Sequence, residues 1–176
     1  AVAAAVRLAL GRPVLFRQPR IGRDGRVFTL LKFRTMTDAR DDAGRPLPDA
    51  RRLTRLGRFL RATTLDELPE VLNVLRGDMS VVGPRPLLVD YRDLYTPRQW
   101  RRHEMRPGMA GPVVAAGRNT LSWEEKFELD VRYVEEWSLA RDFAILGRAI
   151  GRVITRHGVA APGHATMPRF EGAPAR

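Results

Sequence analysis

Apolar residues recur at helical spacing near the middle of the chain and predict a helix there. Five of them share one helical face: Leu65, Leu68, Val71, Leu72 and Leu75. We expect a helix over residues 66–76 that packs this face inward. Thr64 and Glu67 have the spacing of a capping box, and Gly77 stands where a left-handed C-cap is common.

The same periodicity predicts helices on both sides of this segment. Residues 51–62 form a basic amphipathic pattern, residues 88–105 are compatible with a helix, and residues 139–154 form a second amphipathic helix that closes the bundle. Ser122 and Glu125 make a capping box at the start of a further helix. That helix places four apolar side chains on one side: Trp123, Phe127, Val131 and Val134.

Apolar and polar residues before position 34 predict a short β-hairpin. We expect strands at residues 14–16 and 26–33, joined by a turn at residues 22–25 that contains an Asp-Gly pair. Lys32 and Arg34 are two positions apart and therefore share one face of the second strand. Because the phenylalanine between them should face the core, both cations should face the open side.

The ends and the connections of the chain have a different character. Residues 1–12 begin with an apolar, helical run that is far too short to span a bilayer, which needs about 20 apolar residues. We expect them to be the end of a truncated membrane helix; the alternative is a short amphipathic helix of a soluble protein. Residues 37–50 and 106–112 predict polar or turn-rich loops, and residues 161–176 predict an irregular tail.

Together these patterns predict an α+β fold that is mostly helical with a short β-hairpin. The 176 residues contain no internal repeat and no sign of a second folded unit. Residues 13–160 are therefore expected to form one domain, which is long enough to bury a real core.

The formal charge of +11 is concentrated in the first third of the chain. Residues 1–62 carry fifteen Lys or Arg and five Asp or Glu, a net charge of +10, and the remainder carries +1. This asymmetry predicts a polyanionic partner, either nucleic acid or an anionic membrane. The aromatic residues are not interleaved with basic ones, and no RNA-binding or zinc-finger signature occurs, which favours a membrane surface and argues against nucleic acid.

The basic helix at residues 51–62 suits anionic headgroups, at about 1 kcal/mol per basic residue near the surface. A helix packed by its leucines, with solvated arginines outside, has the same pattern and is the alternative.

The residue inventory excludes several kinds of site. There is no cysteine, so disulfides, thiolate catalysis and cysteine-based zinc sites are excluded. Neither a P-loop nor a Rossmann glycine motif occurs. His103, His157 and His164 are scattered, without metal-ligand spacing.

Asp66 and Glu67 are the candidate catalytic groups. They lie at the start of the predicted helix, where the helix dipole favours an ionised carboxylate. Six basic residues flank them in sequence: Lys32, Arg34, Arg58, Arg61, Arg85 and Arg106. A carboxylate that attacks phosphorus, or that holds Mg²⁺ for this purpose, needs such cations to offset the phosphate charge. The alternative is that Asp66 is only an N-cap and that Glu67 only complements the helix dipole.

Four stretches together resemble the bacterial sugar transferases, which are monotopic polyprenol-phosphate phosphoglycosyl transferases. They are KFRTM at 32–36, TLDELPEVLNVLRGDMSVVGPRPL at 64–87, RPGMAG at 106–111 and GRNTLSWEEKFELDVRYVEEWSL at 117–139. The tail GHATMPRFEG is similar to the ending of the small single-domain branch. The resemblance covers nearly the whole chain in order, and the block at 64–87 is highly specific.

The resemblance implies a reaction and a location. Members transfer a sugar-1-phosphate from a UDP-sugar to undecaprenyl phosphate, release UMP and need Mg²⁺. This is the first membrane step of surface glycan or glycoprotein assembly, at the cytoplasmic face of the bacterial inner membrane. Residues 13–160 would then be a monotopic, membrane-associated catalytic domain, and residues 1–12 the exit of its re-entrant helix.

The resemblance also implies roles for residues. Asp66 would be the nucleophile that forms a phosphosugar-aspartyl intermediate, and Glu67 would support both the metal and the nucleophile. Lys32 would contact this pair. The residues implied to bind phosphate are Lys32, Arg61, Arg85 and, as a weaker match, Arg106. A covalent intermediate predicts ping-pong kinetics.

One loop departs from the family pattern. Where members often carry G-W-A-Q-V-N-G-R-N, this chain has GPVVAAGRN at 111–119. Pro112, Val114 and Ala116 replace Trp, Gln and Asn, and the loss of these polar groups is expected to alter a contact to the sugar or to uridine.

The rival hypothesis is a non-catalytic basic module that binds a membrane surface or nucleic acid. Such a module has no reason to keep Lys32, Arg61, the Asp66-Glu67 pair and Arg85 together, so we favour the enzyme. The sequence indicates neither the sugar nor the oligomeric state.

Overall fold

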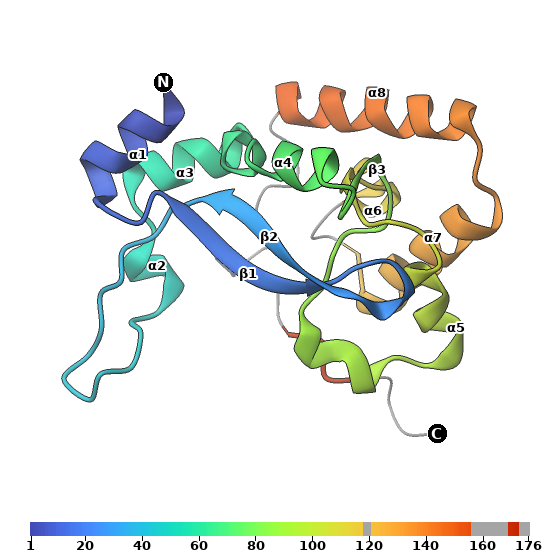
Figure 1. Ribbon diagram of the computed structural model, residues 1–176, viewed down its shortest axis with the longest axis horizontal. Helices are drawn as coiled ribbons and strands as arrows, with labels where there is room; N and C mark the ends of the chain where they lie inside the picture. Colours follow the sequence, from blue (N-terminus) through green and yellow to red (C-terminus); the bar gives the residue numbers. More distant parts are fainter. Residues whose placement is uncertain (118–120, 156–168, 173–176) are drawn as a thin grey trace.

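The computed structural model describes residues 1–117, 121–155 and 169–172, and only the backbone of residues 152–155 (Figure 1). In chain order the elements are α1 (Val2–Leu10), β1 (Leu15–Ile21), η1 (Arg23–Gly25), β2 (Val27–Phe33), α2 (Asp49–Arg52), α3 (Arg55–Ala62), η2 (Leu65–Glu67), α4 (Glu70–Leu75), β3 (Ser80–Val82), η3 (Val89–Leu94), α5 (Pro97–Trp100), η4 (Arg101–His103), β4 (Gly108–Ala110), α6 (Pro112–Ala116), α7 (Trp123–Glu135) and α8 (Leu139–Thr155), where η denotes a 3₁₀ turn. The predicted α+β class is confirmed, with an antiparallel hairpin and a short parallel strand pair.

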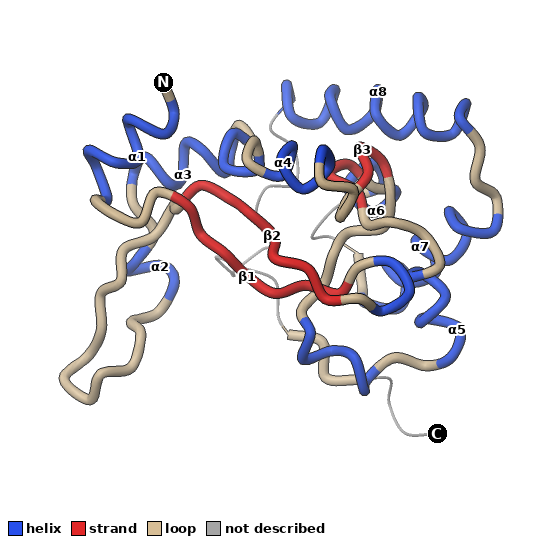
Figure 2. The backbone as a smooth tube through the Cα atoms, viewed as in Figure 1, coloured by secondary structure: helices blue, strands red, loops and turns tan. Residues whose placement is uncertain are grey.

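The hairpin of β1 and β2 runs through the middle of the molecule (Figure 2). Its register pairs Leu15 with Phe33 and Ile21 with Val27. The sequence predicted only residues 14–16 as the first strand, because Pro19 and the polar residues around it interrupt the apolar pattern. A strand edge that has no partner needs no N–H donor and tolerates proline, so β1 continues to Ile21.

The predicted central helix differs most from expectation. Residues 65–67 form a 3₁₀ turn, and the α-helix spans only Glu70–Leu75. Its apolar face points outward: Leu68, Val71, Leu72 and Leu75 are 47, 43, 45 and 77 % exposed. Glu70 and Asn73 are buried instead, at 3 and 0 % exposed. The prediction that the leucine face packs inward was wrong, whereas Gly77 does adopt the expected left-handed conformation (φ 80°).

Asn73 explains why α4 turns its polar face inward. Its side-chain nitrogen donates to the Thr29 carbonyl at 2.8 Å, and its Oδ1 accepts from the Leu31 N–H at 3.1 Å. The buried Leu31 N–H would otherwise have no partner, which is costly. The side-chain amide of Asn73 therefore holds α4 against the hairpin, and the leucines of α4 lie on the opposite side of the helix.

Two other predicted helices are interrupted. The segment at 51–62 divides into α2 and α3, because Thr54 caps α3 by accepting from the Gly57 N–H at 2.9 Å. Residues 88–105 do not form one helix, since Thr96 and Pro97 begin α5 afresh between two 3₁₀ turns. The predicted loop at 106–112 contains β4, which pairs in parallel with β3; strands of three residues have too few positions to show a period.

The core consists of two hydrophobic clusters, and α7 contributes to both. The capping box of Ser122 and Glu125 is present, and the expected inner face of α7 is confirmed by the burial of Phe127 and Val131. One cluster is built on Tyr91, Phe127 and Phe170, the other on Val82, Ala115, Tyr133 and Ile145. Phe170 is 3 % exposed although it belongs to the predicted irregular tail.

Four helices, α1, α3, α4 and α8, lie along one edge of the molecule (Figure 1). Within residues 1–117, 121–155 and 169–172, no helix is both long enough and apolar enough to cross a bilayer.

Candidate active site

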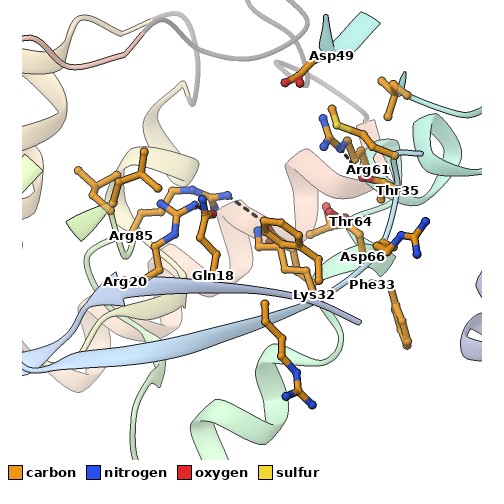
Figure 3. Close-up of a pocket in the computed structure, with 18 of the residues that line it drawn as sticks. Gln18, Arg20, Lys32, Phe33, Thr35, Asp49, Arg61, Thr64, Asp66 and Arg85 are labelled. Carbon is orange, nitrogen blue, oxygen red and sulfur yellow. Dashed lines mark hydrogen bonds and ion pairs between the residues drawn. The ribbon is translucent and has the colours of Figure 1, made fainter. Parts of the chain in front are cut away.

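A hollow of about 1590 Å³ opens beside the hairpin. Its walls are β1, β2, residues 64–67, the segment around Arg85 and part of α7. Figure 3 shows Lys32 between two groups of side chains. Gln18, Arg20 and Arg85 lie on one side of it, and Thr35, Arg61, Thr64 and Asp66 lie on the other.

Glu67 is buried and takes two cations. Lys32 Nζ lies 2.6 Å and Arg85 Nη2 lies 3.1 Å from the same oxygen, Oε1. Burial alone would raise the pKa of Glu67, but the charges of Arg85 and Lys32 outweigh it and lower the pKa to about 2. Glu67 is therefore ionised at physiological pH and ties the hairpin, the 3₁₀ turn and the Arg85 segment together.

Glu70 is a member of this cluster that the sequence analysis missed. It is 3 % exposed, and its Oε1 lies 3.2 Å from Lys32 Nζ. Burial raises its pKa, against the opposing charge of Lys32. In the helix predicted over residues 66–76, the spacing of four positions would have placed Glu70 on the same side as Asp66, and this signal was overlooked in favour of the leucine pattern.

Asp66 differs from its neighbour, because no described side chain forms a hydrogen bond or ion pair with its carboxylate. It is 8 % exposed and lines the hollow. Burial and then the charge of Glu67 raise its pKa; Lys32, Arg61 and a hydrogen bond from its own backbone act in the opposite direction. A carboxylate with raised pKa beside open volume can attack or bind a ligand.

The backbone of Thr64 sets the position of Asp66. Thr64 has φ 59° and ψ 12°, in the left-handed region that β-branched residues avoid. Such a conformation costs of order 1–3 kcal/mol. The Glu67 N–H donates to the Thr64 carbonyl at 3.1 Å, but the predicted capping box is absent, because the Thr64 side chain makes no cap. Its hydroxyl is buried without a hydrogen-bond partner among the described residues.

Arg61 reaches the hollow from α3. Its Nε donates to Thr35 Oγ1 at 3.1 Å, and its charge lowers the pKa of Asp66. Gly57 permits this arrangement, because a Cβ at residue 57 would lie 1.9 Å from the Thr35 carbonyl oxygen. Only glycine allows α3 to pass so close to the segment that holds Arg61 in place.

Arg85 is supported by an ion pair that the sequence analysis missed. Arg102 Nη2 lies 2.5 Å from Asp130 Oδ2, and both side chains are almost fully buried. The same nitrogen donates to the Arg85 carbonyl at 2.7 Å. Breaking one half of such a pair leaves a buried charge and is strongly destabilising. No pattern in a single sequence distinguishes Asp130 from an ordinary surface aspartate on α7.

The other predicted basic residues contribute less. Arg34 and Arg58 border the hollow, but Arg34 donates to two backbone carbonyls near the end of α1, and Arg58 donates to the Leu53 carbonyl at 3.3 Å. Arg106 is exposed and lines a separate hollow of about 340 Å³. The structure does not bring Arg106 to Asp66.

Asp66 and Glu67 were also predicted to hold Mg²⁺. In the part of the chain that the structure describes, no three His, Cys, Asp or Glu side chains gather closely enough to enclose a metal ion. Asp66 offers carboxylate oxygens that no described side chain binds, and in Glu67 both cations donate their hydrogen bonds to Oε1. Mg²⁺ is commonly held by one or two carboxylates together with water and substrate phosphate. The residues present fit an ion that is completed by the substrate.

Comparison with known proteins defines the class. Residues 1–156 match the sequence profile described as bacterial sugar transferase. Since this match covers most of the chain, the protein belongs to the bacterial sugar transferase family, and it is an enzyme.

Three relatives illustrate the similarity. The chain is 54 % identical over 169 residues to the "Uncharacterized sugar transferase EpsL" of Bacillus subtilis, with 96 % of this chain and 84 % of the relative covered. It is 40 % identical over 163 residues to the "UDP-glucose:undecaprenyl-phosphate glucose-1-phosphate transferase" of Caulobacter vibrioides, covering 87 and 61 %. It is 36 % identical over 165 residues to the "Undecaprenyl-phosphate galactose phosphotransferase" of Salmonella typhimurium, covering 84 and 35 %. The chain thus spans most of the first relative's length and about a third of the last.

Proposed function

We propose that this enzyme transfers a sugar-1-phosphate from a UDP-sugar to undecaprenyl phosphate and releases UMP. One observation carries the proposal: the Asp66 carboxylate has no side-chain partner within the described part of the chain and lines a hollow that Lys32, Arg61 and Arg85 also line. The names of two relatives, which include undecaprenyl phosphate together with glucose-1-phosphate or galactose, support the same reaction class.

Asp66 acts as the nucleophile in this proposal. One of its oxygens bonds to the sugar-bearing phosphorus while the bond from that phosphorus to the bridging oxygen breaks, and UMP leaves with that oxygen. An oxygen of undecaprenyl phosphate then attacks the same phosphorus, and Asp66 is released as a carboxylate. Because the intermediate separates the two transfers, the kinetics are ping-pong.

Lys32, Arg61 and Arg85 offset the charge of the diphosphate. Guanidinium groups form paired hydrogen bonds with phosphate oxygens, and an ammonium group acts as a compact charge. Glu67 holds Lys32 and Arg85 in place through its two ion pairs. Mg²⁺, held by oxygens of Asp66 and Glu67, supplies further positive charge to the diphosphate when bound.

The helical edge contacts the cytoplasmic face of the inner membrane in this proposal. Its four helices expose eight large apolar side chains among the described residues, namely Leu8, Phe59, Val71, Leu72, Leu75, Leu139, Phe143 and Ile150, and Leu68 just before α4 is exposed as well. Among the described residues, the same helices and the position after α4 expose five basic residues: Arg7, Arg55, Arg58, Arg76 and Arg148. Exposed apolar side chains accompanied by basic ones match an anionic membrane, which offers both hydrocarbon and negative charge. This placement gives the lipid acceptor access to the enzyme.

The test incubates the whole chain with Mg²⁺ and a panel of UDP-sugars, without lipid. The wild-type protein should gain the mass of one sugar phosphate and release UMP. Asp66→Asn should show neither effect. Folding raises the pKa of Asp66, so the charged form destabilises the folded state at neutral pH. The Asn variant should therefore melt at a higher temperature, which separates lost chemistry from lost folding. Turnover by this variant, or no UMP from any donor with the wild type, contradicts the proposal.

A further inference from the structure

Arg20 lies on the hairpin and lines the hollow, but it has no role in the mechanism above. Arg20 and Gln18 are two positions apart on β1, so their side chains share one face of the strand. The face is the one that also bears Lys32, as Figure 3 shows. All three residues line the hollow. Arg20 therefore stands in the same hollow as Asp66, on the other side of Lys32.

The guanidinium group of Arg20 is only partly satisfied. Its Nη2 donates to Gln18 Oε1 at 2.6 Å, and its Nη1 donates to the Pro86 carbonyl at 3.3 Å. Its Nε is buried without a hydrogen-bond partner among the described residues. Because a guanidinium group has five N–H donors in a fixed fork, most of its capacity remains unused.

Arg20 also lacks a carboxylate partner among the described residues, unlike its neighbours. Arg102 pairs with Asp130, and Arg85 pairs with Glu67. The formal charges of the cluster support this difference. Its three carboxylates, Asp66, Glu67 and Glu70, already balance the three positive charges of Lys32, Arg61 and Arg85. The charge of Arg20 is therefore left without a balancing charge in the cluster.

The surroundings of Arg20 are electrostatically unfavourable for its positive charge. Burial and then the charge of Arg85 lower the pKa of Arg20 to about 10. An anion in contact with the guanidinium groups of Arg20 and Arg85 would offset this electrostatic penalty. It would also accept hydrogen bonds from the N–H groups of Arg20 that Gln18 and Pro86 do not use.

We propose that Gln18, Arg20 and Arg85 form the subsite for the phosphate of the departing UMP. The inference rests on the proposed function. In-line displacement places the attacking and leaving oxygens on opposite sides of the reacting phosphorus. Asp66 lies on one side of Lys32, and Arg20 with Arg85 lies on the other, where the leaving phosphate gains charge. Gln18 is a positioning residue, because it fixes the guanidinium plane of Arg20.

The same subsite then receives the phosphate of the lipid acceptor. Its attacking oxygen must approach from the side that the leaving oxygen occupied, since the phosphorus is now bonded to Asp66. Arg20 therefore contributes to both half-reactions.

The test compares Arg20→Ala with Arg26→Ala. The control removes the same charge from the exposed start of β2, away from the hollow. Calorimetry measures the binding of UMP, UDP and uridine to the whole chain. Arg20→Ala should weaken UMP and UDP binding between about 10- and 100-fold, the range for a lost charge-assisted hydrogen bond, and leave uridine binding unchanged. Arg26→Ala should match the wild type for all three ligands.

The outcomes separate this inference from the proposed function. A wild-type protein that forms no adduct and releases no UMP overturns the function. An active wild type whose affinity for UMP is unaffected by Arg20→Ala overturns only the subsite. If Arg20→Ala does not fold, the subsite can be tested in the wild type by NMR, through the Nε–H resonance of Arg20. It should shift saturably on titration with UMP and remain fixed with uridine; a fixed signal in both titrations refutes the subsite.

Discussion

Two adjacent carboxylates in this site have opposite electrostatic states. Glu67 takes both neighbouring cations on one oxygen, and their charges lower its pKa to about 2. Asp66 has no such partner, and burial raises its pKa. The two groups are neighbours in sequence, but the 3₁₀ turn directs them to different surroundings. Pairs whose environments separate their pKa values commonly divide the chemical roles between them.

Glu67→Gln should shift the acid limb of the pH–rate profile to lower pH. The substitution removes a negative neighbour that raises the pKa of Asp66, and it frees Lys32, which lowers that pKa. In this variant, Asp66 should therefore remain ionised at a lower pH than in the wild type. The measurement is kcat/KM for the residual release of UMP between about pH 4 and 8, because a carboxyl group with a raised pKa titrates within roughly this range. An unchanged or higher acid limb contradicts the assignment of Asp66.

A stability measurement on the same variant provides the control. Glu67 has a folded pKa of about 2, below its ordinary value of 4.5. Its ionised form therefore stabilises the wild type above pH 4.5, and this contribution disappears as the pH falls through about 2. Glu67→Gln should be less stable than the wild type at neutral pH, and the difference should shrink between these limits.

Residue-level prediction located the charged residues of the site, although some of them are far apart in sequence. The Asp66-Glu67 pair and the flanking cations Lys32, Arg61 and Arg85 come together as expected. Arg20 was not predicted, because its importance lies in a missing partner, and a sequence does not show which arginines are paired. Arg106 was predicted at the site but lines another hollow, just before β4, and the chain returns to the site hollow only afterwards, at Val113 and Val114 of α6.

At the scale of elements, the largest difference between prediction and structure is the orientation of α4. Its leucine pattern correctly predicted a helix but assigned the wrong face to the interior. Hydrophobic periodicity identifies an apolar face without stating whether protein or lipid covers it. The deciding residue is Asn73, whose amide bonds to β2 across 42 to 44 positions of sequence. Such a pairing depends on the fold and cannot be derived from local spacing.

Replacing two of these leucines should weaken membrane binding and leave folding intact. Leu72→Gln combined with Leu75→Gln removes exposed apolar area from α4. We expect at least about a tenfold loss of binding to vesicles that contain anionic lipid. The free energy of unfolding should change by only about 0.5 kcal/mol, as at other surface positions. Vesicle sedimentation and thermal unfolding measure the two effects.

Val27→Gln is the matched control for this variant. Val27 is 53 % exposed but lies on the hairpin, away from the helical edge. The Val27→Gln variant should bind vesicles as the wild type does. If the double leucine variant also binds normally, α4 does not face the lipid.

At the scale of the whole molecule, the end of the chain helps to close the core. Phe170 packs between Tyr91 and Phe127, and its backbone N–H donates to the Tyr91 hydroxyl at 3.2 Å. The sequence predicted an irregular tail because glycine, proline and alanine surround this residue. Residues 169–172 contain neither helix nor strand, and the rest of the predicted tail lies outside the described residues. Composition averages over a window and therefore overlooks one buried aromatic ring.

Phe170→Ala should therefore destabilise the whole domain by about 3–5 kcal/mol, the usual cost of deleting a buried phenylalanine. Phe143→Ala is the control, because Phe143 is 71 % exposed on α8 and should change stability by only about 0.5 kcal/mol. Urea unfolding of the purified chain gives both values. Equal stability of the two variants would place Phe170 outside the core.

The unusual backbone of Thr64 has a consequence for the newly synthesised chain. A threonine does not enter the left-handed region by its own preference, so only the finished contacts around it can hold the turn that carries Asp66. A chain emerging from the ribosome, or one that is partly melted, would keep its aspartate but not this geometry. Nucleotide sugars would thus be safe from wasteful cleavage by immature copies, because reactivity appears only together with the complete fold.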